Sequence, residues 1–252
     1  MNNIQKEQVM KMDEQLRSIQ ENLQYIQENL TKLDEPIIIE FLGTPKSGKT
    51  TLVTSLENLF KRNDVPVNKK RETAEYNPIQ DKTIEEYNIW MIMELMKNIS
   101  EDVSSKDPKV IIYDRGALDR IPWIETSVND GSFPRNDVDI IKGLYQSEFM
   151  SKYKPLTYGF YTTPETSIMR KGKPGRLVNQ VTLTEYNSQF IAAEDFIKER
   201  SEKYTHIDTD PYQGKLNSFI TDIAERVTTD AKEIIQERLK SKEKPEGPSL
   251  DD

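Results

Sequence analysis

The feature that most constrains this chain is the stretch IIIEFLGTPKSGKTTL, residues 37–52. A run of branched apolar residues leads into a loop with two glycines, and a lysine and two threonines follow the second glycine. Gly43, Gly48, Lys49 and Thr50 satisfy the pattern G-x-x-x-x-G-K-[ST] in full, in which backbone N–H groups surround phosphate oxygens. The flanking residues read as a strand and a helix, as such a loop requires. The stretch therefore predicts a nucleoside triphosphate site.

The residues of this phosphate-binding loop have separate expected roles. The glycines let the backbone curl inward, and the following helix offers its positive end to the phosphates. Lys49 is expected to reach the β- and γ-phosphates, and the Thr50 hydroxyl is expected to bind Mg²⁺. The triphosphate is expected to be ATP, and its expected contacts are Gly43, Thr44, Pro45, Lys46, Ser47, Gly48, Lys49, Thr50 and Thr51.

Strand-like and helix-like segments alternate from residue 37 onwards. Apolar runs predict strands at Ile37–Leu42, Val65–Lys69, Val110–Tyr113, Leu156–Tyr161 and Tyr204–Asp208. Helical patterns cover Thr50–Arg62, Ile84–Ile99, Asp137–Met150, Thr184–Arg200 and Lys215–Leu239. This alternation predicts an α/β fold with a doubly wound, parallel five-stranded sheet and helices on both faces. Ligands of such sheets bind at the carboxyl ends of the strands.

Apolar residues recur at alternating spacings of three and four near the front of the chain. This seam consists of Val9, Met12, Leu16, Ile19, Leu23, Ile26, Leu30 and Leu33. The pattern predicts a long amphipathic helix, which Pro36 ends. Two interpretations remain open, because the helix could pack on its own domain or form a coiled coil with a second copy or a partner protein. The narrow, regular seam favours self-association.

We divide the chain into three parts. Residues 1–34 form the amphipathic helix, residues 35–240 form the α/β domain, and residues 241–252 form a charged tail with Pro and Gly that is expected to be disordered.

Composition excludes several classes of protein. The chain has 252 residues, no cysteine and a single histidine, which argues against disulfides, zinc–cysteine sites and a Ser-His-Asp triad. That histidine, His206, lies in the last predicted strand and is expected to be a core residue. A net charge of −8 argues against a long nucleic acid as partner. No apolar stretch is long enough to cross a bilayer and the N-terminus is polar, so we expect a cytoplasmic protein.

Three further stretches follow predicted strands. They are KKRETAEYNP at residues 69–78, YDRGALDR at residues 113–120 and TTPETSIMRKGKPGR at residues 162–176. Asp114, at the end of its strand, has the placement of an acid that helps to hold Mg²⁺ and its waters. The alternative is a turn-forming Asp before Arg115.

Together with the phosphate-binding loop, these stretches resemble the deoxynucleoside kinase and thymidylate kinase group of P-loop phosphotransferases. The resemblance covers about residues 36–210 and rests on the order and spacing of the motifs. It implies that Arg71 and Glu72 meet the acceptor, with Glu75 as the alternative carboxylate. Asp114-Arg115 matches the acidic residue and arginine that this group has after its third strand.

The resemblance also implies a lid after Pro164-Glu165, in which arginines close over the transferred phosphoryl group. Phosphoryl transfer requires positive charge around the equatorial oxygens, and a loop with Gly and Pro can bring it in when substrate is bound. Tyr87 and Trp90 are implied to face the acceptor base, as is Trp123, and the alternative for all three is a place in the core. The expected catalytic residues are Lys49, Glu72, Asp114, Arg115, Arg170 and Arg176, the expected acceptor contacts are Arg71, Glu75, Tyr87 and Trp90, and the expected metal ligands are Thr50 and Asp114.

The sequence departs from this group at several motifs. It has DRG where nucleoside kinases commonly have DRS, and its lid sequence mixes lysine with arginine. The acceptor therefore stays open between a nucleoside, a nucleoside monophosphate and another hydroxyl-bearing molecule. The motifs favour a Mg²⁺-ATP-dependent kinase with a small acceptor. The alternative is an NTP-dependent ATPase or binding switch that acts through assembly of the front helix, and phosphorylation of a nucleic-acid end ranks last because the chain is acidic.

Overall fold

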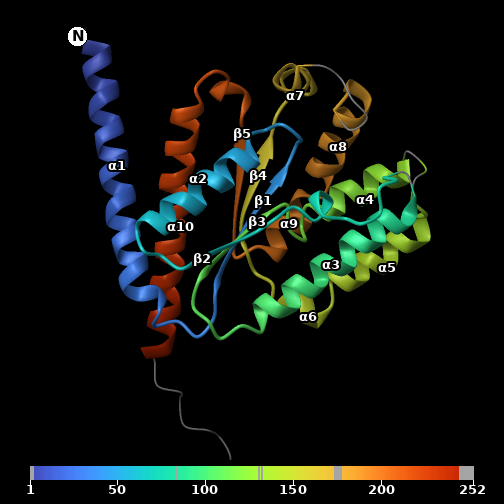
Figure 1. The fold of residues 1–252 in the computed structure, drawn as a ribbon, viewed down its shortest axis with the longest axis horizontal. Coiled ribbons are helices and arrows are strands. Elements are labelled where there is room, and N and C mark those ends of the chain that lie inside the picture. Colours follow the sequence, from blue (N-terminus) through green and yellow to red (C-terminus); the bar gives the residue numbers. More distant parts are fainter. Residues whose placement is uncertain (1–2, 83, 130, 132, 173–177, 244–252) are drawn as a thin grey trace, which may run out of the picture.

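A five-stranded sheet forms the centre of the computed structural model, which describes residues 3–82, 84–129, 131, 133–172 and 178–243 (Figure 1). All neighbouring strands are parallel, in the order β2-β3-β1-β4-β5. The strands are β1 Ile37–Gly43, β2 Val67–Lys70, β3 Val110–Asp114, β4 Leu156–Tyr161 and β5 Lys203–Asp208. This arrangement confirms the predicted α/β class and the five-stranded parallel sheet.

Helices cover both faces of the sheet (Figure 1). The helices are α1 Asn3–Leu30, α2 Lys49–Arg62, α3 Glu85–Val103, α4 Arg120–Asn129, α5 Arg135–Tyr145, α6 Glu148–Ser151, α7 Pro164–Lys171, α8 Gln180–Ala192, α9 Glu194–Arg200 and α10 Leu216–Glu243. Two short 3₁₀ turns are η1 Thr73–Glu75 and η2 Asp210–Tyr212. Helices α1, α2 and α10 lie on one face, and α3 to α6, α8 and α9 lie on the other.

Strand β1 divides its side chains between two hydrophobic cores. Ile37, Ile39 and Phe41 point into the core shared with α1, α2 and α10, whereas Ile38 and Leu42 point into the core on the opposite face. This division follows from the two-residue period of a strand. A strand buried on both faces reads as a continuous apolar run, which is why β1 was predictable from sequence.

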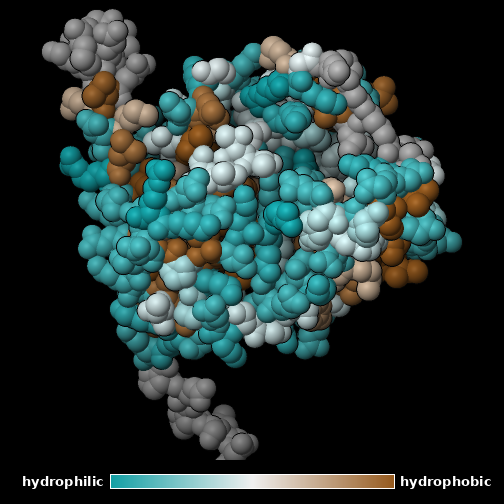
Figure 2. All heavy atoms as spheres, viewed as in Figure 1, coloured by the Kyte–Doolittle hydropathy of each residue, from teal (hydrophilic) through white to brown (hydrophobic). Residues whose placement is uncertain are grey.

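Helix α1 packs along α10 of the same chain (Figure 1). The second half of its seam is buried in the core, with Leu23, Ile26 and Leu30 completely inaccessible to solvent. The first half is exposed, since Val9 and Leu16 keep 49% and 52% of their surface, and Figure 2 shows hydrophobic side chains on the upper part of this helix. The second half of the α1 seam therefore packs on the domain of its own chain. Association through the first half stays a prediction.

Several helix boundaries differ from the predicted ones. The pattern at residues 137–150 predicts one helix, but the structure has α5 and α6, and the Ser147 hydroxyl accepts the Met150 amide to begin α6. The pattern at residues 184–200 predicts one helix, but the structure has α8 and α9, which meet at Ala193. Helices α4 and α7 were not predicted, although Thr163 before Pro164 is a recognisable start signal for α7.

The end of the chain and the single histidine also differ from expectation. Helix α10 continues to Glu243, three residues into the segment expected to be disordered, and residues 244–252 lie outside the described residues. The prediction that His206 is a core residue is wrong, because β5 is an edge strand and the His206 side chain is 40% exposed beside Glu194. Among the helices of the described residues, none has both the length and the apolar composition that crossing a bilayer requires.

Candidate active site

The phosphate-binding loop connects β1 to α2 with a backbone that only certain residues allow. Gly43 and Gly48 have φ angles of 117° and 100°, in the region that disfavours side chains. A Cβ atom on Gly43 would lie 2.0 Å from the carbonyl oxygen of Phe160 in β4. Glycine at this position therefore lets the loop begin in direct contact with the neighbouring strand.

Lys49 lies inside this loop, in the first turn of α2. Its Nζ donates hydrogen bonds to the carbonyl oxygens of Gly43 and Thr44, at 2.8 and 2.7 Å, and to the Ser47 hydroxyl at 3.0 Å. Burial and the nearby Arg115 lower the pKa of Lys49 to about 7. A phosphate oxygen beside Nζ would favour the charged form of Lys49.

A cavity of about 410 Å³ opens beside the loop at the carboxyl ends of the strands. Its lining joins residues from the loop, from the segment after β2, from the segment after β3 and from α7. These residues are Pro45, Lys46, Gly48, Lys49, Thr50, Thr51, Glu72, Arg115, Trp123, Arg170 and Val178. The cavity thus brings together six of the predicted loop residues and three of the predicted catalytic residues outside the loop.

Arg115 follows β3 with a left-handed φ of 66° and is almost completely buried. Its Nη1 donates to Asp119 Oδ2 at 2.6 Å, and its Nε lies 3.3 Å from Glu72 Oε1. The other oxygen of Asp119 accepts the Gly43 amide and the Tyr186 hydroxyl, both at 2.8 Å. Burial raises the pKa of Asp119, but Arg115 and the other nearby cations outweigh that effect and hold it below its usual value. The ionised carboxylate therefore joins Arg115 to the phosphate-binding loop.

Asp119 and Asn187 are site residues that the sequence analysis missed. Asn187 in α8 accepts a hydrogen bond from the Thr44 hydroxyl at 2.7 Å and donates to the Thr162 carbonyl at 2.9 Å. Asp119 is in the quoted stretch YDRGALDR, so its position was visible. Asn187 lies 143 positions from Thr44 along the chain and carries no local signal.

The two glutamates proposed for the acceptor end differ in placement. Glu72 lines the cavity and its side chain is 27% exposed, whereas Glu75 in η1 is exposed and is not among the described residues that line the cavity. Arg71 is also exposed, with its guanidinium 5.5 Å from the centre of the Tyr76 ring. Of the two alternatives, Glu72 is the carboxylate that lies beside the phosphate-binding loop.

Arg170 lies in the last turn of α7 rather than in a loop. It donates to the Thr209 carbonyl at 2.7 Å, to the Thr209 hydroxyl at 3.1 Å and to the Lys46 carbonyl at 3.3 Å. Burial lowers its pKa. Arg170 therefore connects α7, the loop after β5 and the phosphate-binding loop. The predicted lid residue Arg176 lies outside the described residues.

The three aromatic candidates divide between the cavity and its surroundings. Trp123 lines the cavity, 4.5 Å from the Tyr186 ring and 5.7 Å from the Arg115 guanidinium carbon. Trp90 instead packs edge-on against Tyr76 at 5.7 Å, and Tyr87 is only 6% exposed. Tyr87 and Trp90 are not among the described residues that line the cavity.

Thr50 and Asp114 are the candidate magnesium ligands, and of these two only Thr50 is among the described residues that line the cavity. Thr50 is exposed at the cavity, and Asp114 is 5% exposed with an Oδ1 atom that has no hydrogen-bond partner among the described residues. Mg²⁺ prefers oxygen donors, and it commonly takes one or two from protein and the rest from phosphates and waters. Across the part of the chain that is described, no group of three His, Cys, Asp or Glu side chains could hold a metal by itself.

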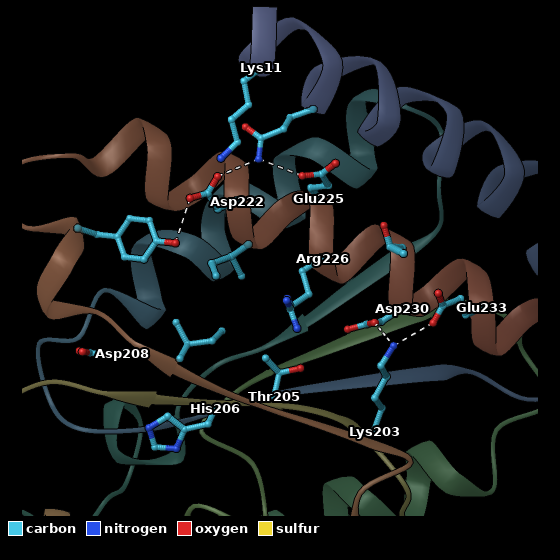
Figure 3. A pocket seen from close by; sticks show the side chains of 15 residues that line it. Lys11, Lys203, Thr205, His206, Asp208, Asp222, Glu225, Arg226, Asp230 and Glu233 are labelled. Carbon is cyan, nitrogen blue, oxygen red and sulfur yellow. Dashed lines mark hydrogen bonds and ion pairs between the residues drawn. The ribbon is translucent and has the colours of Figure 1, made fainter. Parts of the chain in front are cut away.

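A separate cavity of about 680 Å³ lies between β5, α10 and α1 (Figure 3). Its charged groups largely pair with one another, since Lys203 contacts Asp230 and Glu233, and Gln15 donates to Asp222 and Glu225. None of the predicted site residues in the described part of the chain lines it. The Gln15 contacts fasten α1 to α10 and the Lys203 contacts fasten β5 to α10, so the cavity belongs to the packing of these helices on the sheet.

No protein-family model matches the sequence, and no curated protein matches it. Among solved structures, a deoxyadenosine kinase from M. mycoides with bound dATP is similar, with a TM-score of 0.52 and 18% identity over 72% of this chain and 99% of that chain. The same enzyme with bound dCTP gives a TM-score of 0.48, with 18% identity over 72% of this chain and 100% of that chain. At these identities the likeness concerns the fold. The chain therefore shares the α/β fold of that deoxyadenosine kinase.

Proposed function

We propose that this chain is a Mg²⁺-ATP-dependent kinase that transfers the γ-phosphoryl group to a hydroxyl of a small, nucleoside-like acceptor. The observation that carries this proposal is the 410 Å³ cavity, in which the phosphate-binding loop, a carboxylate and two arginines face one space. Beyond the phosphate-binding loop, a kinase needs a base for the acceptor hydroxyl and cations for the transferred group. Glu72 and Arg170 fill these two roles, and Arg115 lies beside Glu72.

The proposed reaction assigns one role to each residue. Glu72 takes the proton of the acceptor hydroxyl, whose oxygen forms a bond to the γ-phosphorus while the bond to the β–γ bridging oxygen breaks, so that ADP leaves. Lys49 and Arg170 offset the charge on the phosphoryl oxygens, and Arg115 orients Glu72 through its Nε. Thr50 and Asp114 would hold Mg²⁺, which supplies charge neutralisation on the phosphates.

A nucleoside fits the acceptor end better than a nucleoside monophosphate. Arg115 already has two carboxylate partners, Glu72 and Asp119, and Lys70 at the end of β2 is paired with Asp102 at 3.0 Å. A monophosphate would have to compete with these carboxylates for the same cations. A neutral nucleoside would instead use Glu72 and the Trp123 ring, which supports ATP with a nucleoside as the substrate pair.

The test follows the γ-phosphate of labelled ATP with Mg²⁺, in parallel reactions with pooled nucleosides, pooled nucleoside monophosphates and no acceptor. We expect label on a nucleoside, and no transfer by the Lys49→Ala variant, whose circular dichroism should match that of the unsubstituted chain. Label on a monophosphate would correct the acceptor class. Label found only in inorganic phosphate would contradict the kinase.

The exposed first half of the α1 seam supports a second candidate function. Val9, Met12 and Leu16 continue the periodicity of the buried half but cover no part of the described core. We propose that this surface associates with a second copy or a partner protein. An ATPase switch working through it would release inorganic phosphate without an acceptor and would change its light-scattering mass on binding ATP. A constant mass that is the same for Leu16→Glu would contradict this candidate.

A further inference from the structure

Strand β1 carries a glutamate in the middle of its apolar run. Glu40 has no solvent exposure and points to the same face of the sheet as Ile38 and Leu42. A buried carboxyl group without hydrogen-bond partners would destabilise the fold. The position therefore calls for specific hydrogen bonds.

Glu40 has three hydrogen-bond donors, all outside its own strand. Its Oε1 accepts the backbone amides of Leu118 at 2.9 Å and Asp119 at 3.1 Å, and its Oε2 lies 2.8 Å from the Tyr153 hydroxyl. The two amides belong to the turn between β3 and α4. At a regular helix start, a nearby capping side chain accepts hydrogen bonds from backbone amides that have no partner within the helix. Glu40 does the same for the amides of this turn.

Gly116 leaves the space that the Glu40 carboxyl group occupies. A Cβ atom on Gly116 would lie 2.5 Å from the Glu40 carboxyl carbon and 2.8 Å from the Tyr153 hydroxyl oxygen. Both distances are well below van der Waals contact, and the closely packed interior leaves the Glu40 and Tyr153 side chains little room to move. The position of the Glu40 carboxyl group therefore requires glycine at residue 116 of the DRG motif.

The turn that Glu40 holds carries both groups that connect the acceptor end to the phosphate-binding loop. Asp119, whose amide Glu40 accepts, binds the Gly43 amide and Arg115 with its two carboxylate oxygens. Arg115 in turn lies beside Glu72. Glu40 is not among the described residues that line the cavity, so any effect on the reaction passes through the turn.

We propose that Glu40 is a positioning residue. Together with Gly116 it fixes the turn at residues 116–120, so that the Asp119 carboxylate binds the Gly43 amide and the Arg115 guanidinium at the same time. For its effect on transfer, this inference rests on the proposed kinase function. The arrangement itself rests on the contacts of Glu40, Gly116 and Asp119 alone. Small displacements of groups that orient substrate can reduce a rate by about 10²-fold.

The experiment compares five variants. Glu40→Ala removes the acceptor oxygens, Glu40→Gln keeps Oε1 for the two amides, and Gly116→Ala adds the conflicting methyl group. The double variant combines Glu40→Ala with Gly116→Ala. The matched control is Tyr158→Phe, which removes a buried tyrosine–carboxylate hydrogen bond of 2.7 Å to Asp230 on the opposite face of the sheet.

We expect kcat to fall about 10- to 100-fold in Glu40→Ala and in Gly116→Ala, and to stay within about threefold in Glu40→Gln and Tyr158→Phe. The double variant should lose less than the product of the two single losses, because the added methyl group then meets the Tyr153 hydroxyl but no carboxyl group. An unchanged kcat in Glu40→Ala, or a double variant showing the product of both losses, would overturn the proposal.

Hydrogen exchange separates this inference from the kinase function. In Glu40→Ala the amides of Gly43, Leu118 and Asp119 should exchange at least about tenfold faster than in Tyr158→Phe. Equal exchange rates in the two variants would overturn the positioning role even if transfer is observed. The unsubstituted chain could transfer no phosphate while the same three amides exchange faster in Glu40→Ala. That result would contradict the kinase function and support the positioning role of Glu40.

Discussion

Arg115 Nη1 and Asp119 Oδ2 form a buried ion pair at 2.6 Å, four residues apart in the turn between β3 and α4. The same Asp119 side chain accepts the amide of Gly43, the first glycine of the phosphate-binding loop. One carboxylate thereby sets the distance between the loop and the arginine that faces Glu72. The ion pair is the connection on which the proposed site depends.

Replacing Asp119 with Asn should destabilise the protein by about 3 kcal/mol, because removal of one charge from a buried pair leaves the other uncompensated. Denaturant unfolding measures this change. The control is Glu125→Gln, whose partners Arg135 and Lys142 are 52% and 38% exposed, and for which less than about 1 kcal/mol is expected. Equal losses in the two variants would show that Arg115 does not depend on Asp119.

Replacing Glu72 with Gln should lower kcat by about 10²- to 10⁴-fold, the range for loss of a general base. The matched variant Glu75→Gln should stay within about twofold, because Glu75 is exposed outside the cavity. Steady-state kinetics with a saturating acceptor measures both. A large loss in Glu75→Gln with none in Glu72→Gln would move the base to the other carboxylate.

Replacing Arg170 with Ala should lower kcat by about 10³-fold, the lower end of the range for an arginine at a transferred phosphoryl group. The neighbouring Lys171 is exposed and serves as the control, with little change expected for Lys171→Ala. Single-turnover transfer from labelled ATP separates the chemical step from product release. Equal rates in the two variants would remove Arg170 from the site.

The stability of the protein should depend on pH through Glu40. Burial raises the pKa of Glu40 from 4.5 to about 8, with Tyr153 and the amide of Asp119 opposing that shift and the Asp119 charge adding to it. The folded state therefore holds the proton at pH values where the unfolded chain has released it. The stability from this group is complete below about pH 4.5 and is lost as the pH rises toward 8.

The measurement compares the free energy of unfolding of the unsubstituted chain with that of Glu40→Gln, whose side chain does not titrate, at pH 5, 6, 7 and 8. The difference between the two should move in favour of Glu40→Gln as the pH rises. Parallel curves would show that Glu40 does not change its protonation across this range.

The buried and exposed halves of the α1 seam should contribute unequally to the stability of the protein. Leu23→Ala should cost about 2–5 kcal/mol, because Leu23 is completely buried against the core. Leu16→Ala should change stability by less than about 0.5 kcal/mol in the monomer, because Leu16 is 52% exposed. Thermal or denaturant unfolding at low protein concentration measures both. A large loss in Leu16→Ala that grows with concentration would indicate association through this part of α1.

Elements whose signals are local could be predicted from the amino-acid sequence. The apolar run before Gly43, the spacing of Gly48, Lys49 and Thr50, and the alternation of strands and helices predicted the phosphate-binding loop and a parallel sheet. These signals are local because strand period, helix period and glycine conformation depend on neighbouring residues. They also placed Glu72, Arg115 and Arg170 after strands, which the sheet brings to one edge.

Contacts between residues that are distant in the sequence became visible only in the folded chain. The heptad seam of α1 could not specify whether it would bury itself on α10 or on another chain, since either partner offers the same apolar surface. In the sequence, Glu40 is a single polar residue in an apolar strand. In the structure it binds the amides of Leu118 and Asp119, 78 and 79 positions away. Such contacts arise because a parallel sheet aligns segments through long crossovers, and their residues carry no mark of the partner in the local sequence.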